Sequence, residues 1–520
     1  MSDNTNNEDV STELAQAAEA RDQSRINFYG GTLMSALPIA LFVIWAIVQS
    51  GVLRVSDTTG LVAGMLISLI LGMLFVKGSW KAYANTIFAG MTQRVAATAI
   101  VAWLWAGMFA QTIQEGGFVG GLVWAADALN VGASIFPAIT FILAALLATG
   151  IGTGYGTTVA FTTLVFPAGV VLGADHVLLF GAILSGAAFG DNLAPVSDTT
   201  IVSAVTQKSD IGGVVSSRFK YAIVAAVLAF VGYIIAGSYM TGFDISQNAQ
   251  QLFVSNSNPM GLIHLFSMFV VIATAVRGRH IVEAISWGLI VAVVLNLLLG
   301  LASVSDMIVF KASQNLGAAQ SLSVLPFIEL VEPGNTGVGG SIYTGAEGFF
   351  PLAILVLLIV AGSQIMIRGG GFEALQNWLL NSVATSVRRA ELVMVLGTAI
   401  ANAMITINTA AEIAIAPYIA RIGEKFNING YRRANILDAN TTALGYIFPW
   451  AGGVLVGYAE IRDLPSQFGW FTQSMVANPI EVWPFVFHGW FLFGVFIVAA
   501  LSGFGLEYVS DRQSMEVTRL

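Results

Sequence analysis

Residues 190–200 read GDNLAPVSDTT and form a polar segment within a long apolar stretch. The residues on either side, 177–189 and 201–205, have the composition of a membrane-spanning helix. Pro195 lacks a backbone donor, so a helix that reaches it breaks and leaves carbonyl groups unpaired. The segment therefore predicts a membrane helix that is interrupted near its middle.

The same segment gathers oxygen atoms of the kind that bind a hard cation. They belong to Asp191, Asn192, Ser197, Asp198, Thr199 and Thr200. A carboxylate at membrane depth is costly unless it is paired, hydrated or bound to an ion, so we predict a Na+ site at Asp191 and Asp198. The alternative is a kinked helix whose acids pair with a basic residue elsewhere in the chain. The absence of Lys and Arg between His176 and Lys208 disfavours this alternative.

The composition is that of a polytopic helical membrane protein. Of the 520 residues 56% are hydrophobic and 10% are charged, whereas soluble domains have roughly 25% charged residues. Apolar runs predict about 11 to 13 membrane elements in an all-α fold surrounded by the lipid bilayer. The chain has no Cys, which excludes disulfides and thiolate metal sites, and its net charge of −8 does not favour nucleic-acid binding.

Basic residues fall in alternate loops and set the predicted orientation. They include Lys77, Lys81, Arg94, Lys208, Arg218, Lys220, Arg432 and Arg433. By the positive-inside rule these loops and both termini are cytoplasmic, in a cytoplasmic (inner) membrane. The predicted regions are a disordered tail (1–28), N-terminal transmembrane helices (29–94), a first transport repeat (95–240), linking helices with an external loop (241–348), a second inverted repeat (349–506) and a C-terminal tail (507–520). The Gly-rich part of the external loop, residues 333–341, is predicted to form turns.

Two halves of the chain share their motifs in the same order. Residues 111–118 (QTIQEGGF) resemble residues 364–372 (QIMIRGGGF), and the final phenylalanines are 372 − 118 = 254 positions apart. Pro195 and Pro449 are separated by the same distance, 449 − 195 = 254. Because the charges put matching turns on opposite sides of the membrane, we predict inverted-topology repeats with discontinuous helices, a pattern typical of secondary transporters.

A second polar segment, GTGYGTT at residues 152–158, is predicted to form a hairpin turn within the membrane. Its glycines allow a sharp turn and close approach to a ligand, and its hydroxyls supply ligand oxygens. The predicted hairpin and substrate residues are Gly152, Thr153, Gly154, Tyr155, Gly156 and Thr157.

The matching segment of the second half, TINTAAE at residues 406–412, supplies Asn408, Thr409 and Glu412. Glu412 is a candidate carboxylate for a proton or Na+; the alternative is a protonated carboxyl group that is hydrogen-bonded within the bundle. The counterpart of the interrupted helix supplies Asp438, Asn440, Thr441 and Pro449 as a second-repeat site. Asp438 either belongs to that site or pairs with Arg432 or Arg433 at an interface.

The segments at 190–200, 152–157 (GTGYGT) and 448–450 (FPW) resemble the NhaC-type sodium/proton antiporter family over about residues 30–505. The resemblance implies cation binding by Asp191, Ser197, Asp198, Thr199 and Thr200, and a hairpin shaped by Gly152, Thr153, Gly156 and Thr157.

The chain departs from the usual family pattern at several positions. Ala194 stands in place of the usual Ser, and Gly154 with Tyr155 in place of Ser-Trp. Residues 437–441 (LDANT) and 449–453 (PWAGG) replace EDSGT and PWNT. Relatives of this family also exchange sodium with organic acids or carry amino acids.

The leading prediction is a sodium/proton antiporter driven by an ion gradient, because no nucleotide-binding domain is recognisable. It is neither an enzyme nor a cofactor-dependent protein, and Na+ and H+ compete for the carboxylates at the helix break. The alternative is a sodium-coupled transporter of a small organic solute, an amino acid or a carboxylate. A homodimer is compatible with both interpretations.

Overall fold

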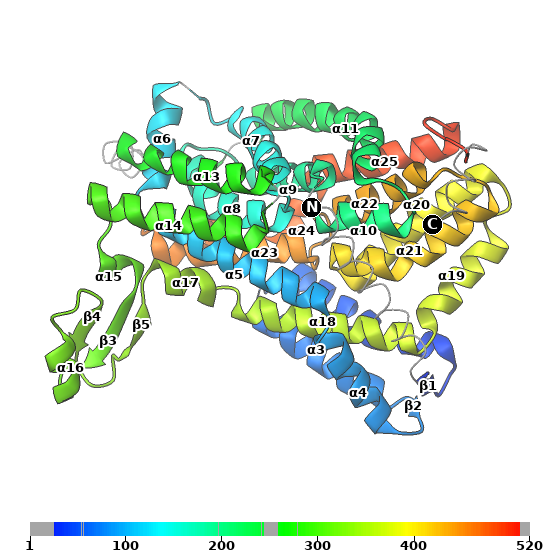
Figure 1. The fold of residues 1–520 in the computed structure, drawn as a ribbon, viewed down its shortest axis with the longest axis horizontal. Coiled ribbons are helices and arrows are strands. Elements are labelled where there is room, and N and C mark those ends of the chain that lie inside the picture. The colour runs from blue at the N-terminus through cyan, green and yellow to red at the C-terminus, as the bar shows by residue number, and fades with distance from the viewer. Residues whose placement is uncertain are drawn as a thin grey trace.

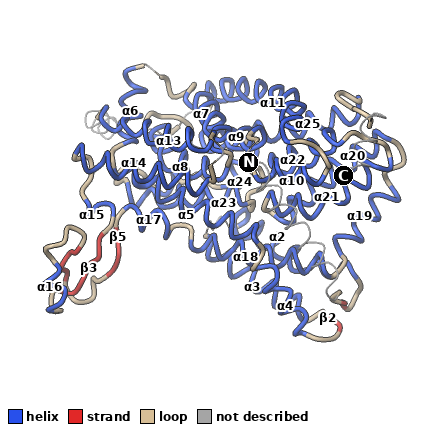
Figure 2. Tube along the Cα trace, viewed as in Figure 1, coloured by secondary structure: helices blue, strands red, loops and turns tan. Residues whose placement is uncertain are grey.

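The computed structural model describes residues 25–53, 55, 57–129, 131–195, 197–240, 242–243, 258–277 and 279–509. It is a bundle of helices with little strand, as Figure 2 shows. Within the described residues, eight helical segments are long and apolar enough to cross a membrane: Thr32–Ser50, Arg94–Glu115, Gly154–Val171, His176–Leu193, Ile211–Tyr239, Val282–Leu299, Ser341–Arg368 and Gln473–Ser502. Thr58–Met73, Phe136–Ile151 and Pro259–Ala275 are shorter apolar helices. The predicted all-α polytopic membrane fold is confirmed.

The N-terminal region precedes the repeats. It comprises β1 (Asn27–Phe28), η1 (Thr32–Ala36), α2 (Leu37–Ala46), η2 (Ile47–Val52), α3 (Thr58–Met73), β2 (Val76–Lys77) and α4 (Trp80–Met91). β1 pairs with β2 in antiparallel register, so Asn27 and Phe28 do not belong to a disordered tail as predicted. Residues 1–24 of that predicted tail, and residues 510–520 at the other end, lie outside the described part of the chain.

The first repeat contains seven helices. They are α5 (Arg94–Glu115), α6 (Phe118–Ala128), α7 (Phe136–Ile151), α8 (Gly154–Val171), α9 (His176–Leu193), α10 (Asp198–Thr206) and α11 (Ile211–Tyr239). Carboxylate caps fix two of their starts: Asp175 accepts a hydrogen bond from the Leu178 amide at the start of α9, and Asp210 accepts one from the Gly213 amide at the start of α11.

The segment between the repeats contains two membrane helices and a small folded region. The helices follow η3 (Pro259–Ile263) and are α13 (His264–Val276) and α14 (Ile281–Leu299). Next come α15 (Val304–Met307), β3 (Val309–Ser313), α16 (Gly317–Leu322), β4 (Ile328–Val331), β5 (Gly337–Gly339) and α17 (Ser341–Glu347). β3 pairs in parallel with β4 and antiparallel with β5, so the predicted external loop carries a three-stranded sheet. Of the segment predicted to form turns, residues 333–341, the residues 337–339 form the strand β5. Figure 1 shows this sheet projecting from one end of the molecule, opposite the end that carries β1 and β2.

Residues 349–506, which were predicted as the second repeat, are also mainly helical. They contain α18 (Phe350–Arg368), α19 (Gly371–Ser382), α20 (Val387–Ile405), α21 (Asn408–Lys425), α22 (Gly430–Leu444) and α23 (Gly452–Gln467). After η4 (Gln473–Met475), α24 (Pro479–Val482) and η5 (Trp483–Phe485), the last helix is α25 (Phe487–Ser502).

Helix bounds recur at the offset found in the sequence. α8 and α21 are 254 residues apart at both ends (408 − 154 and 425 − 171), and α10 and α23 begin at the same interval (452 − 198). The packing is reciprocal as well: α8 packs on α23 and α21 on α10, while α11 packs on α22 and α25 on α9. Two copies of one unit related by a two-fold axis would pack in this way.

Candidate functional site at the interrupted helices

Each repeat contains a sharp turn between two antiparallel helices. Gly152 ends α7 in the left-handed conformation (φ 75°), and Thr153 is extended and accepts a hydrogen bond from the Gly156 amide. In the second repeat Thr406 takes the left-handed conformation (φ 64°) and Ile407 is extended. The left-handed conformation destabilises a residue with a side chain by about 1–2 kcal/mol. Thr406 therefore adopts the same turn conformation as Gly152 although its side chain disfavours it.

Each repeat also contains a helix that breaks where the sequence predicts. α9 ends at Leu193 and α10 begins at Asp198, with Pro195 between them. α22 ends at Leu444 and α23 begins at Gly452, with Pro449 in the gap.

The N-terminal ends of four helices meet between the repeats. Thr409, in the first turn of α21, donates a hydrogen bond of 2.5 Å to Asp198 at the start of α10. The Gly452 amide at the start of α23 donates to the carbonyl oxygen of Thr406 at 3.0 Å. Tyr155 at the start of α8 lies beside Tyr446, with ring centroids 5.7 Å apart. Since helix N-termini carry partial positive charge, the region attracts negative groups.

Asp191 is buried and is bound by neutral donors. The Ser197 hydroxyl donates to it at 2.8 Å and the Tyr446 hydroxyl at 3.1 Å. Asp191 is 4% exposed, and among the described residues no Lys or Arg is paired with it. Its negative charge is therefore hydrogen-bonded but not neutralised by a protein cation.

Asp198 differs from Asp191 because it is exposed. Its carboxylate accepts the Thr409 hydroxyl and, at 3.0 Å, the backbone amide of Thr199. Pro195 beside it is exposed as well. Asp198 is therefore accessible at the surface of the structure, whereas Asp191 lies in the protein interior.

Hydroxyl groups lie between Asp191 and Asp438. Ser197, which donates to Asp191, lies 3.0 Å from the Thr199 hydroxyl, and Thr442, which donates to Asp438 at 2.7 Å, lies 3.4 Å from the same hydroxyl. Acids that are far apart in the sequence thus belong to one polar network.

The base that neutralises Asp438 is Arg218, and the sequence analysis missed it. Arg218 was assigned to the cytoplasmic charges, but it is fully buried and pairs with Asp438 instead of exposing its charge. It also donates to the carbonyl oxygen of Asn192 at 2.5 Å and to the Thr200 hydroxyl at 3.3 Å. The alternative pairing of Asp438 with Arg432 or Arg433 is wrong.

Two observations support the pairing of Asp438 with Arg218. Arg432 instead pairs with Glu391 at 2.6 Å, while Arg433 donates to the Gln207 carbonyl oxygen. On α11, Arg218 shares a helix face with Val214, Tyr221 and Ala222, which are all buried, so the three- and four-residue spacing could have revealed its position.

The remaining predicted residues fall into two groups. Glu412 is fully buried, accepts the Thr441 hydroxyl at 2.8 Å and has a second oxygen without a protein partner in the described structure. The side chains of Asn192 and Asn408 and the hydroxyl of Tyr155 likewise have polar atoms without such a partner. The Asn440 amide donates to Val395 and Thr398, but its oxygen also has no partner in the described structure, whereas Thr157 donates to the Thr153 carbonyl oxygen.

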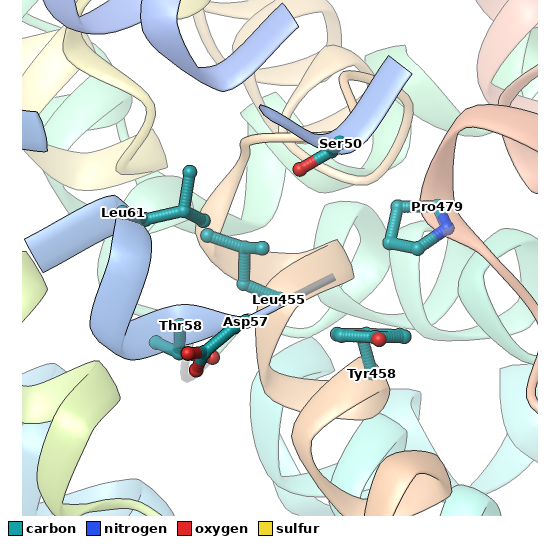
Figure 3. Close-up of a pocket in the computed structure, with 7 residues that line it drawn as sticks. All are labelled: Ser50, Asp57, Thr58, Leu61, Leu455, Tyr458 and Pro479. Carbon is teal, nitrogen blue, oxygen red and sulfur yellow. The ribbon is translucent and has the colours of Figure 1, made fainter. Parts of the chain in front are cut away.

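A shallow pocket on the bundle is separate from this network. Figure 3 shows its lining, which consists of Ser50, Asp57, Thr58, Leu61, Leu455, Tyr458 and Pro479. It shares no residue with the acids described above, so we do not assign the network's chemistry to it.

The chain is similar to one family of known proteins and to several of its relatives. The model of the Na+/H+ antiporter family matches residues 25–238 and 208–490. The malate-2H(+)/Na(+)-lactate antiporter of Bacillus subtilis is 28% identical over 239 residues, which are 46% of this chain and 46% of that protein. The arginine/ornithine antiporter ArcD of Halobacterium salinarum is 23% identical over 369 residues, 69% of this chain and 72% of that protein. The structure of Neisseria gonorrhoeae MtrF matches with a TM-score of 0.41 and 11% identity, over 89% of this chain and 94% of that chain.

Proposed function

We propose, on the premise that this chain belongs to the Na+/H+ antiporter family, that it exchanges Na+ for H+ across a membrane at Asp191 and Asp198. As a multi-span membrane protein of this family it is a transporter and not an enzyme. The contacts of the acids support the finer assignment to Na+ and H+.

The observation that carries the proposal is the contrast between acids that have a counter-charge and acids that have none in the described structure. Asp438 has Arg218 as a counter-charge and Glu391 has Arg432. Asp191 and Asp198 receive hydrogen bonds from Ser197, Tyr446, Thr409 and the Thr199 amide, which leave their negative charges in place. A charged pair of this kind at membrane depth requires a cation or a proton.

Na+ and H+ are mutually exclusive at such a site. A proton removes the charge that holds Na+, and bound Na+ disfavours protonation. Exposed Asp198 receives the cation, and Asp191, Ser197 and Thr199 supply further oxygens from the interior. Alternating access then carries either ion, but not both, across the membrane.

The orientation belongs to the same proposal. From the basic loops we propose that both termini are cytoplasmic and the β3–β5 region is outside, in the cytoplasmic membrane. The two repeats are then inverted, with the α7–α8 hairpin entering from outside and the α20–α21 hairpin from the cytoplasm. The homodimer stays a prediction from the sequence.

The test uses purified protein in liposomes with a pH dye inside and ²²Na+ outside. We expect Na+ uptake to be coupled to H+ release in the wild type and abolished in Asp191→Asn and Asp198→Asn. Glu424→Gln, a change at an acid that lies on the surface and pairs with Lys208, is the matched control and should transport normally. Normal Na+/H+ exchange in both Asp→Asn variants would refute the assignment.

A second candidate function is sodium-coupled exchange of a small organic acid or amino acid. It is favoured by the four helix N-termini, whose partial positive charge suits a carboxylate ligand. The relatives named for malate, lactate, arginine and ornithine point the same way. If this candidate holds, one such solute raises Na+ affinity at fixed pH, because the coupling of two ligands is reciprocal.

A further inference from the structure

A carboxyl group outside the network described above lies inside the bundle. Glu460, on α23, is 5% exposed. One of its oxygens accepts hydrogen bonds from the Thr163 hydroxyl of α8 at 2.7 Å and from the Gln111 amide of α5 at 3.2 Å. Three helices thus meet at this carboxyl group, and both donors are neutral.

The charged groups nearest to Glu460 do not neutralise it. On its own helix, Arg462 is bound to Asp463 and to Asp57, each at 3.5 Å. α5 carries Glu115 one turn beyond Gln111, α17 carries Glu347, and α8 carries no charged residue. In the described part of the chain no Lys or Arg forms an ion pair with Glu460. Burial of a carboxylate without a counter-charge is costly, so the group requires a bound proton or cation.

Glu460 lies on a helix that begins at the proposed Na+ site, but Glu460 is not part of that site. α8 and α23 both begin at that site and pack along each other. Thr163 follows Tyr155 by 163 − 155 = 8 residues, and Glu460 follows Gly452 by 460 − 452 = 8 residues. Eight residues of α-helix span about 12 Å. The carboxyl group is therefore too distant to bind the same ion but moves with the helices that hold it.

The geometry points to Glu460 as an additional proton site of the transport cycle, loaded and released separately from the carboxylates that bind Na+. The step is a reversible protonation: the carboxylate takes up H+ from water on one side, stays neutral while the site is reoriented, and returns H+ to water on the other. The Thr163 hydroxyl and the Gln111 amide hold the group in place when it is charged. This inference rests on the proposed Na+/H+ exchange.

The test compares Glu460→Gln with the wild type in liposomes, using ²²Na+ and a pH dye. The amide keeps the size and hydrogen-bonding ability of the side chain but cannot take up the proton. We expect Na+/Na+ exchange to continue at the wild-type rate, while the number of H+ moved per Na+ falls by one. Glu115→Gln, which alters an exposed acid one turn beyond Gln111, should leave that ratio unchanged.

If Glu460→Gln does not transport, an infrared difference spectrum between low and high pH tests the inference instead. A protonated carboxyl band that is present in the wild type and absent from folded Glu460→Gln supports the assignment. An unchanged H+/Na+ ratio, or an unchanged carboxyl band, overturns it. Absence of Na+ movement in the wild type would instead refute the proposed function, so the two failures are distinguishable.

Discussion

The buried acids of the bundle differ in what compensates their charge. Asp438 pairs with Arg218, and Glu391 pairs with Arg432, which also donates to the Tyr221 hydroxyl at 2.8 Å. Asp191 has hydroxyl donors alone among its described partners. Paired acids hold helices together, whereas an acid with neutral partners is available to a mobile cation.

Loss of Arg218 is expected to destabilise the fold, because it leaves Asp438 charged and unpaired in the interior. Arg218→Gln should lower the free energy of unfolding by about 3–5 kcal/mol. Arg218→Gln combined with Asp438→Asn should recover most of that loss, since the double variant buries no charge. Thermal unfolding followed by tryptophan fluorescence measures both. A single variant as stable as the wild type would contradict a structural ion pair.

Removal of the Tyr446 hydroxyl is expected to weaken Na+ binding. Tyr446→Phe deletes a donor to Asp191, so the charged form of that carboxylate is less stabilised and a proton competes better. A hydrogen bond to a charged group contributes about 1.5–3 kcal/mol, so the apparent Na+ affinity should fall roughly tenfold or more.

The matched control is Tyr418→Phe, because the Tyr418 hydroxyl is buried and has no hydrogen-bond partner in the described structure. Calorimetric titration with Na+ at fixed pH should show wild-type affinity for this variant. Equal affinities for Tyr446→Phe and Tyr418→Phe would exclude Asp191 from the Na+ site.

At the scale of elements, a carboxylate cap joins α11 to α22. Asp210 caps α11 through the Gly213 amide at 2.6 Å and also accepts a hydrogen bond from Tyr431 of α22. The Tyr431 hydroxyl and the Gly213 amide hold the pKa of Asp210 below its ordinary value. The cap thus joins the first repeat to the second at the start of α11.

Because the pKa of Asp210 is lowered, the stability that its carboxylate contributes depends on pH in a defined direction. A group whose folded pKa lies below its unfolded value contributes stability above the unfolded pKa and loses it as pH falls through the folded pKa. Asp210→Asn should therefore unfold at a lower temperature than the wild type at neutral pH, and the difference should shrink below about pH 4. A difference in unfolding temperature that is independent of pH would show that the carboxylate charge does not matter.

At the scale of the whole molecule, local and long-range features differ in how well the sequence predicts them. Helix breaks at Pro195 and Pro449 and the turn at Gly152 follow from residues that disrupt a helix locally. The turn at Thr406 was predicted only from its alignment with the segment at Gly152, and all four positions lie between consecutive helices in the structure.

Features that depend on tertiary packing were not predicted. Arg218 meets Asp438 across 220 positions of sequence, and Tyr446 meets Asp191 across 255. No local pattern links such partners, because each helix carries several polar residues and packing decides which ones meet. The β3–β5 sheet was missed because its strands have five, four and three residues, too few for a clear alternation.

The proposed inversion of the repeats predicts which loops are accessible from outside. Since the chain has no native Cys, single cysteines report accessibility without background. In intact cells a membrane-impermeant thiol reagent should label Asn335→Cys, between β4 and β5, and Gln473→Cys, after α23. It should not label Lys425→Cys at the end of α21. The reverse labelling pattern would invert the orientation of the whole molecule.

The central claim is that Asp191 and Asp198 bind Na+ in competition with H+. Its most direct measurement is calorimetric Na+ binding to purified protein at two pH values, with wild type, Asp191→Asn and Asp198→Asn compared. We predict that wild-type affinity weakens at the lower pH, that binding releases protons to the buffer, and that neither variant binds Na+. Wild-type Na+ affinity that is independent of pH and retained in both variants would contradict the claim.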